Sequence, residues 1–281
     1  MGKARLCLGT CDAYGRPVEE QIRLFRQAGF DGFFTEWHAG EDMRGYRRLA
    51  DRLGMEYQSV HAPFDRAAAL WETGPRAEAA LEQWLCCLKD CAAAGVPVVV
   101  MHAFIGFQDH SPTKAGPANF QRIADAARRL GVRIALENTE GEEYLAALME
   151  AFRGDDQVGF CWDTGHELCY NRGRDLLRLY GDRLLCTHLN DNLGIGDPAG
   201  EITWMDDLHL LPFDGAADWQ GIARRLDKCG FLGPMTFELS IESKPGRHEN
   251  DRYAAMPLED FLSLAYARAR RAAALRADGR K

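Results

Sequence analysis

The chain has 281 residues, 46% of them hydrophobic, and carries a formal net charge of −8 at pH 7. This composition is typical of a globular protein with a sizeable core, and the negative charge argues against a broad surface for nucleic acid or anionic membranes. No apolar run is long enough to span a bilayer, and the N-terminus lacks the apolar core of a signal peptide. We therefore predict a cytoplasmic protein without a membrane partner.

Short β-rich runs alternate with longer amphipathic runs along the whole chain. The predicted strands occupy residues 4–9, 32–37, 55–61, 96–102, 132–138, 158–163, 183–191 and 234–240. The predicted helices occupy residues 17–29, 42–54, 74–95, 117–131, 142–152, 174–181, 218–230 and 258–275. Apolar residues recur at three- and four-residue spacing in the helical runs, and Pro or Gly stands at several of their ends.

Eight strands that alternate with eight helices favour parallel pairing through right-handed crossovers. At this length the economical arrangement is an α/β fold with a single (β/α)8 TIM barrel over residues 1–281. An open doubly wound sheet is the main alternative, but the residues after the first strand, GTCDAYGRP, do not form a glycine-rich phosphate loop. We predict a frayed tail at 276–281 and a functional role for the long irregular stretch at 190–217.

The nine cysteines are scattered along the chain and form no paired C-x-x-C framework. Neither a zinc ribbon nor a disulfide scaffold is therefore predicted. Several of them lie inside predicted strands or helices, where reduced cysteines usually pack as small apolar residues. We interpret all nine as structural.

Six successive predicted strands end on residues that can bind metals or transfer protons. In chain order, these residues are His61, His102, Glu137, Asp163, His188 and Glu238. In a (β/α)8 barrel, all strands end at one face, which is where active sites of this fold lie. Any one of them has an ordinary explanation, since Asp163, for example, can cap the following helix. The joint pattern favours a divalent cation, because buried carboxylates need compensation and mixed His/carboxylate shells are typical of Zn²⁺ or Mn²⁺.

Six short motifs resemble those of the sugar phosphate isomerase/epimerase superfamily, whose barrel is of the xylose isomerase type. They are SVHAPF (59–64), MHAF (101–104), IALENTEG (134–141), CWDTGH (161–166), THLND (187–191) and TFE (236–238). The resemblance implies one divalent metal ion, Mn, Zn, Mg or Co, bound by Glu137, Asp163, His188 and Glu238. It also implies that Glu137 and Glu238 are the catalytic acid and base. His166, brought back over the rim by a short turn at residues 164–165, would contact the substrate.

The activity that the resemblance implies is a divalent-metal-dependent sugar isomerase or epimerase. Such an enzyme removes a proton next to the metal-bound carbonyl of a ketose or a related sugar. A keto-sugar dehydratase or lyase begins with the same proton abstraction and stays an alternative. Endonuclease IV, of the same superfamily, suggests a second alternative, a phosphodiesterase that acts on abasic DNA with up to three zinc ions. Its additional ligands would correspond here to His61, His102, His166, Asp207 and His209.

Three sequence features weaken the nuclease alternative. No Gly-Ser-Arg run precedes the D-x-H pair formed by Asp207 and His209, and the residues after DTGH also depart from the nuclease pattern. The predicted loops show no concentration of Arg and Lys for duplex phosphates. We therefore expect a small sugar rather than nucleic acid as the partner, and we note that the outer helices of such barrels often pair into a homo-oligomer.

Side chains near the predicted strand ends could contact the sugar itself. Aromatic candidates for stacking on sugar C–H faces are Trp37, Phe104, Trp162 and Trp204, with Phe107 as a further one. Position alone also suggests Glu36 and His38. Basic residues near the rim are few, namely Arg66, Lys114, Lys244 and Arg247, so an unphosphorylated sugar is slightly favoured.

Overall fold

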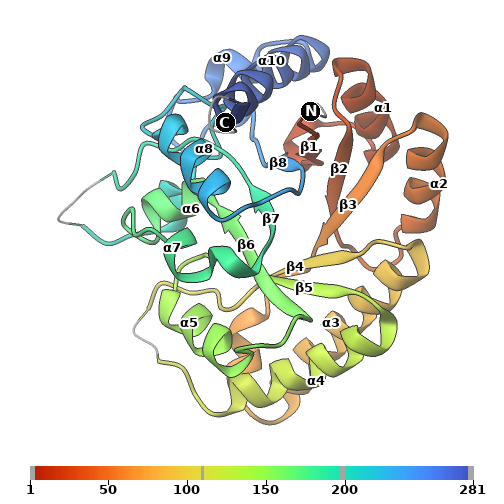
Figure 1. Cartoon of the computed structure of the whole chain (residues 1–281), viewed down its shortest axis with the longest axis vertical. Coiled ribbons are helices and arrows are strands. Elements are labelled where there is room, and N and C mark those ends of the chain that lie inside the picture. The colour runs from red at the N-terminus through yellow and green to blue at the C-terminus, as the bar shows by residue number, and fades with distance from the viewer. Residues whose placement is uncertain (1–3, 109–110, 197–199, 278–281) are drawn as a thin grey trace.

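The computed structural model describes residues 4–108, 111–196 and 200–277. Eight parallel strands form a nearly closed barrel that helices surround on the outside (Figure 1), which confirms the predicted (β/α)8 TIM barrel. The strands are β1 (Leu6–Gly9), β2 (Gly32–Glu36), β3 (Glu56–His61), β4 (Val98–His102), β5 (Arg133–Glu137), β6 (Val158–Asp163), β7 (Leu184–His188) and β8 (Met235–Phe237).

The strands follow one another around the barrel in the order β7-β6-β5-β4-β3-β2-β1-β8. β1 pairs with β8 in parallel, with Cys7 opposite Thr236. β7 and β8 meet through the backbone of Leu189, whose N–H donates to the Thr236 carbonyl (2.8 Å) and whose carbonyl accepts from the Glu238 N–H (3.2 Å). The barrel is therefore joined directly beside two predicted site residues, His188 and Glu238.

The helices largely follow the predicted ones, and local sequence explains where they begin and end. At α2, for example, the Asp42 carboxylate accepts from the Gly45 N–H (2.8 Å), and Gly54 ends the helix with φ +62°. The α-helices are α1 (Val18–Ala28), α2 (Met43–Leu53), α3 (Pro75–Ala94), α4 (Ala115–Leu130), α5 (Glu142–Ala151), α6 (Thr164–Cys169), α7 (Leu177–Tyr180), α8 (Trp219–Lys228), α9 (Asp251–Ala254) and α10 (Leu258–Ala277). Short 3-10 helices are η1 (Asp12–Tyr14), η2 (Ala67–Trp71), η3 (Gly181–Arg183) and η4 (Trp204–Asp206).

The segment after β6 differs from its prediction. Thr164 and Gly165 are the first turn of α6 rather than a separate turn, because the Asp163 carboxylate caps the helix by accepting from the His166 N–H (2.7 Å). Glycine is required at position 165, since a Cβ there would lie 1.9 Å from Asn190 Oδ1. The helix therefore sets the position of His166.

The predicted frayed tail at 276–281 begins with residues that are part of a helix. Arg276, expected in a frayed tail, is buried, and its guanidinium donates to the Asp227 carboxylate (2.9 Å) and to the Phe231 carbonyl (2.7 Å). α10 continues to Ala277 because these bonds hold its last turn against the end of α8 and the segment that follows it. The remainder of the predicted tail, 278–281, lies outside the described residues.

The barrel interior contains a small apolar cluster below the strand ends, which we call the floor. Side chains two positions apart on a strand face the same side of the sheet. On each strand, the residue two positions after a floor residue therefore also points into the barrel. The floor consists of Val98, Val100, Ala135, Cys161 and Cys186. The residues two positions after the last four of these are His102, Glu137, Asp163 and His188.

All nine cysteines are free thiols, and six of them are buried. This agrees with their interpretation as structural residues. Among the described residues, no helix has the length and apolar composition needed to cross a bilayer. The cytoplasmic location stays a prediction.

Candidate active site

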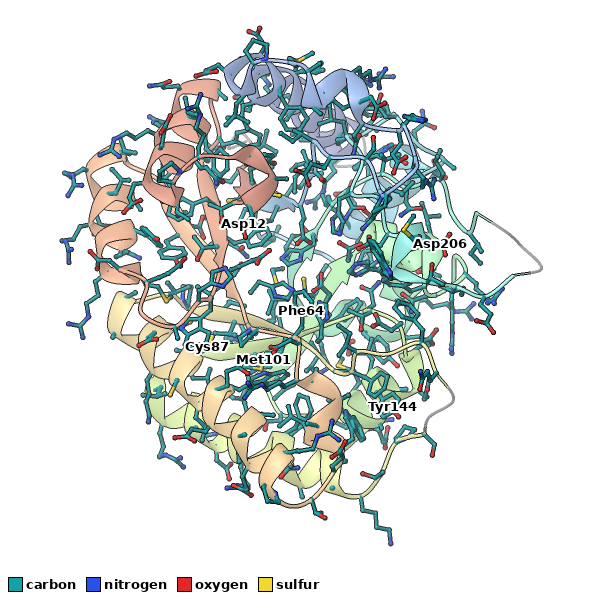
Figure 2. All side chains as sticks on the ribbon, turned by 180° about the vertical axis from the view of Figure 1, so that it is seen from behind. Asp12, Phe64, Cys87, Met101, Tyr144 and Asp206 are labelled. Atoms are coloured by element: carbon teal, nitrogen blue, oxygen red, sulfur yellow. The ribbon has the colours of Figure 1, made fainter. Side chains whose placement is uncertain are left out.

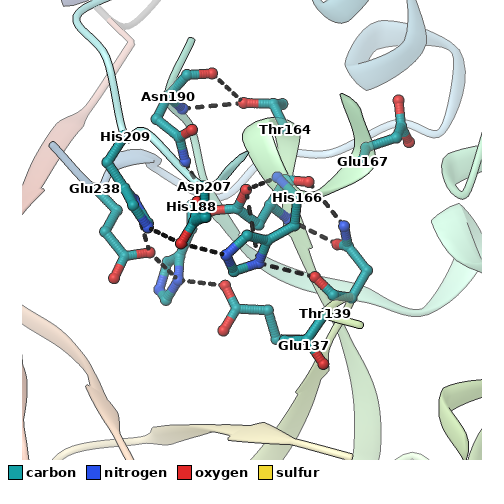
Figure 3. Close-up of polar contacts among 12 residues, drawn as sticks. Glu137, Thr139, Thr164, His166, Glu167, His188, Asn190, Asp207, His209 and Glu238 are labelled. Carbon is teal, nitrogen blue, oxygen red and sulfur yellow. Dashed lines mark hydrogen bonds and ion pairs between the residues drawn. The ribbon is translucent and has the colours of Figure 1, made fainter. Parts of the chain in front are cut away.

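Glu137, at the end of β5, is the carboxylate that most imidazoles of the site contact, and Figure 3 shows its contact with His188. Its buried carboxylate contacts three imidazoles: Oε1 lies 2.7 Å from His188 Nδ1, whereas Oε2 lies 3.1 Å from His61 Nε2 and 3.2 Å from His102 Nε2. Strand register explains part of this arrangement, because His102 is opposite Glu137 between β4 and β5. Three predicted residues from separate strands therefore converge on one carboxylate.

Asp163 and Glu238 complete a second group around His188. Glu238 Oε2 lies 3.0 Å from His188 Nδ1, and Asp163 is opposite His188 between β6 and β7. Ligand atoms of Glu137, Asp163, His188 and Glu238 all lie within 4.8 Å of one another. The structure thus brings together the four residues predicted as metal ligands.

Two asparagines that the sequence analysis missed hold Asp163 in place. Asn138 Oδ1 accepts from the Asp163 N–H, and Asn138 Nδ2 donates to the Asp163 carbonyl, both at 2.8 Å. Asn190 Nδ2 donates to Asp163 Oδ2 (2.8 Å), while Oδ1 of the same carboxylate caps α6. Asp163 is therefore both a helix cap and a member of the ligand group. The signal was present, because Asn138 directly follows Glu137 in the chain.

Asp207, His209 and His166 form a third group at the side of the site. Asp207 Oδ2 lies 2.9 Å from His209 Nε2 and 3.4 Å from His166 Nε2, and His166 Nδ1 donates to the Asn138 carbonyl (2.9 Å). His209 has φ +47°, a conformation that is uncommon for a residue other than glycine and that often occurs at functional sites. The residues predicted as additional ligands thus fall into two groups, His61 and His102 with Glu137, and this one.

The protonation states of the buried glutamates depend on the positive charge of the neighbouring histidines. Burial raises the pKa of Glu238, but His188 and His209 outweigh it and lower this pKa to about 2. Burial likewise opposes ionisation of Glu137, yet its histidine neighbours, His188 above all, hold its pKa well below the ordinary value. Burial lowers the pKa of His209, whereas Asp207 and Glu238 raise it to about 9. These two glutamates are therefore anionic at neutral pH and require protonated histidines or a bound cation beside them, whereas burial raises the pKa of Asp163 to about 6.

Several buried polar atoms of the site have no hydrogen-bond partner among the described residues. Asp207 Oδ1, His209 Nδ1, His102 Nδ1 and His188 Nε2 are of this kind. Buried polar groups without partners are rare in folded proteins, and Asp207 and His209 belong to a potential ligand group. The donors are imidazole nitrogens and carboxylate oxygens, which suit Zn²⁺, Mn²⁺ and related ions. The residues therefore fit a divalent metal ion.

A cleft with two lobes, of about 240 and 340 Å³, opens over these groups. In Figure 2, Phe64 of the smaller lobe lies near the middle of the barrel. The residues that line both lobes are Glu36, Trp204, His209, Glu238 and Lys244.

Of the four aromatic residues predicted as substrate contacts, Trp204 lines the cleft, and three do not. Trp37, Phe104 and Trp162 are buried, and none of them lines either lobe. The indole N–H of Trp162, for example, donates to Glu167 (2.8 Å). The structure therefore places these three rings in the packed interior, because other elements cover their faces.

Other positions around the cleft give a mixed result. Phe107 and Glu36 line it as suggested, whereas His38 lies outside both lobes. The sequence analysis missed Tyr170, which lines the smaller lobe with its ring 5.0 Å from that of His166. Tyr170 is the residue that caps the C-terminal end of α6, and its four-residue separation from His166 places the two rings one helical turn apart.

Known proteins are similar to this chain in sequence or in fold. The protein y4fM of Sinorhizobium fredii, described as uncharacterized, is 26% identical in an alignment of 300 positions that covers 91% of this chain and 93% of that protein. The solved IOLI protein with a bound zinc atom has a TM-score of 0.74 and 17% identity, over 98% of both chains. A D-psicose 3-epimerase in the presence of D-fructose has a TM-score of 0.69 and 15% identity, over 96% of this chain and 97% of that one.

The 3-keto-D-glucoside 4-epimerase YcjR from E. coli has a TM-score of 0.67 and 18% identity, over 93% of this chain and 100% of that one. At these identities, the likeness to solved structures establishes the fold. Residues 22–257 match the family described as xylose isomerase-like TIM barrel. The family to which the resemblance of the strand-end motifs pointed is thereby confirmed, and the chain belongs to the xylose isomerase-like TIM barrel family.

Proposed function

We propose that this chain is a divalent-metal-dependent sugar isomerase or epimerase that acts on a ketose or a related sugar. The observation that carries the proposal is the group of Glu137, Asp163, His188 and Glu238, whose ligand atoms lie within 4.8 Å of one another below the cleft. The epimerases among the structurally similar proteins support the same reaction class.

A divalent ion held by these four residues would polarise a substrate carbonyl and lower the cost of removing the neighbouring proton. The candidates are Mn²⁺, Zn²⁺, Mg²⁺ and Co²⁺, since three carboxylates and one imidazole suit several of these ions.

The two glutamates are not equivalent in access to the substrate. Both oxygens of Glu137 already meet imidazoles, and its side chain is 0% exposed, whereas the side chain of Glu238 is 24% exposed. Glu238 also lines both lobes of the cleft. A proton transferred to or from a bound sugar needs a carboxylate within hydrogen-bond reach. Glu238 is therefore the better placed base, and Glu137 would act as its counterpart deeper in the site.

Two alternatives use the same residues. A keto-sugar dehydratase or lyase begins with the same proton removal and differs in the leaving hydroxyl. An endonuclease IV-like zinc phosphodiesterase is favoured by one observation, the division of the potential ligands into groups that could hold three ions. The scarcity of cations in the cleft opposes it, because phosphodiester backbones are recognised mainly through Lys and Arg.

Proton exchange with solvent tests the proposal directly. The metal-loaded protein should incorporate deuterium from D₂O into one or more members of a ketose library. Glu238→Gln should lower that exchange by about 10²- to 10⁴-fold, the usual contribution of a general base, and Glu137→Gln should do the same. Glu82→Gln, an exposed change on α3, is the matched control and should exchange at the wild-type rate.

Elemental analysis of the same samples separates the alternatives. About one metal ion per chain with proton exchange supports the sugar enzyme. Three zinc ions with incision of abasic DNA would replace the proposal with the nuclease. Full exchange in both glutamine variants would refute the assigned chemistry.

A further inference from the structure

Six carboxylates line the cleft, and among the described residues it contains one Lys or Arg side chain. Among the described residues that line its two lobes, Lys244 is the single Lys or Arg. Of the other basic residues near the rim, Arg247 donates to the Met205 carbonyl (3.0 Å), and Arg66 pairs with its neighbour Asp65 (3.6 Å). The carboxylates that line the cleft are those of Glu36, Glu137, Glu140, Asp207, Glu238 and Glu242.

Among the described residues, Lys244 forms no ion pair with these carboxylates. Its Nζ lies over the Trp204 ring, 5.3 Å from the centroid, and among the described residues no carboxylate oxygen is within 4.0 Å of it. A cation on an indole face is attracted to the ring, but all three of its N–H donors remain available to a ligand. An ammonium with this freedom in an acidic cleft is therefore available to bind an anion.

Lys244 and Trp204 belong to separate loops that hydrogen bonds tie together. The Lys244 N–H donates to the Glu249 carboxylate (3.0 Å), which fixes the loop after β8. Arg247 joins this loop to the one after β7 at Met205, the residue next to Trp204. These bonds hold the two loops together beside the cleft, where the Lys244 ammonium lies over the Trp204 ring.

We propose that Lys244 binds an anionic group of the sugar, so that the substrate is a sugar acid or a sugar phosphate. This inference rests on the proposed function and names the substrate class for the same cleft. Lys244 lines both lobes together with Glu238 and His209, so one small ligand can reach the metal group and the ammonium at once. A carboxylate is favoured over a phosphate, because one ammonium among several carboxylates neutralises one negative charge, and no Arg supplements it.

Titration calorimetry on the metal-loaded protein tests the assignment. The probes are D-glucose, D-glucuronate and D-glucose 6-phosphate, which differ only at C6. We expect the preferred anionic probe to bind about 10- to 100-fold more tightly than glucose, as for a hydrogen bond to a charged group. Lys244→Met should remove that preference, and Lys244→Arg should retain most of it. Lys228→Met, an exposed change on α8, should leave it unchanged.

Each outcome has a defined meaning. A Lys244-dependent preference for glucuronate assigns a sugar acid, and one for glucose 6-phosphate assigns a sugar phosphate. Equal binding of all three probes, or an anion preference that survives Lys244→Met in a folded protein, overturns the inference. Because binding needs no turnover, failure of the proposed function appears separately, as absent proton exchange with the anion preference intact.

Discussion

Two successive layers of the barrel interior differ in chemistry although the same strands build both. The floor is apolar and consists of small or medium side chains, such as Ala135 and Cys161. Two positions further along, the same strands carry Glu137 and Asp163, which are buried and charged. The apolar residues of the floor and the charged residues above them are therefore one pleat apart, roughly 6.6 Å along the strand.

The difference between the two layers explains how the buried carboxylates of the site are kept charged. An apolar floor excludes water from below, and electrostatic interactions are stronger in such a low-dielectric environment. The layer above the floor consists of His102, Glu137, Asp163 and His188, and we call it the ligand layer after its proposed role. Each of its carboxylates must then lie near positive charge at the same level or above it. Glu137 does so through imidazoles on β3, β4 and β7. The floor can therefore be entirely apolar, because the carboxylates above it are paired with neighbouring histidines and need no polar partner from the floor.

The largest expected effect comes from placing a charge in the floor. Ala135→Asp would bury a carboxylate in the apolar cluster below Glu137 without a cation to pair with it. We expect the free energy of unfolding to fall by at least about 3 kcal/mol, as for an uncompensated buried charge. Urea denaturation followed by circular dichroism measures this. Ala79→Asp, on the exposed face of α3, is the control, and equal losses in the two variants would contradict the comparison.

A smaller effect is expected from removing the proposed metal ion, because its removal acts on the ligand layer alone. If the ion is present at a hundredfold excess over its Kd, chelation should lower the free energy of unfolding by about 2.7 kcal/mol. Thermal unfolding with and without a chelator, after dialysis against the candidate ions, provides the measurement. Asp163→Asn should show a much smaller chelator effect, because the variant has lost one ligand. A chelator response of wild-type size in that variant would place the metal elsewhere.

The smallest effect is expected from Cys161→Ala, which tests where the floor ends. Cys161 is opposite Glu137 in register, and its Sγ lies within 4.8 Å of ligand atoms of Glu137 and His188. As a floor residue it should contribute packing only, so the variant should lose about 1 kcal/mol of stability and retain its full metal content. Denaturation and elemental analysis measure both quantities. Loss of the metal would instead assign Cys161 to the ligand layer.

Several features of the fold could not be read from the sequence, for identifiable reasons. α6 and α9 have six and four residues, which is too short for helical periodicity to be distinguished from a turn. Strand-end position did not distinguish Trp162, which is buried against Glu167, from Trp204, which lines the cleft. Which way such a ring points depends on residues from other elements that pack around it.

The sequence by itself determined the barrel and the rim that carries its chemistry, because strand and helix periodicity are local and because parallel strands end at one face. It also identified His61, His102, Glu137 and the other strand-end residues as a set of potential ligands. The tertiary structure alone decided how that set divides, with Glu137 meeting three imidazoles and Asp207 gathering His166 and His209. It also decided that Lys244 stands over Trp204. These contacts join segments that are far apart in the chain. They depend on the paths of the loops, which hydrogen bonds hold in place, for example the bond from Arg247 to the Met205 carbonyl.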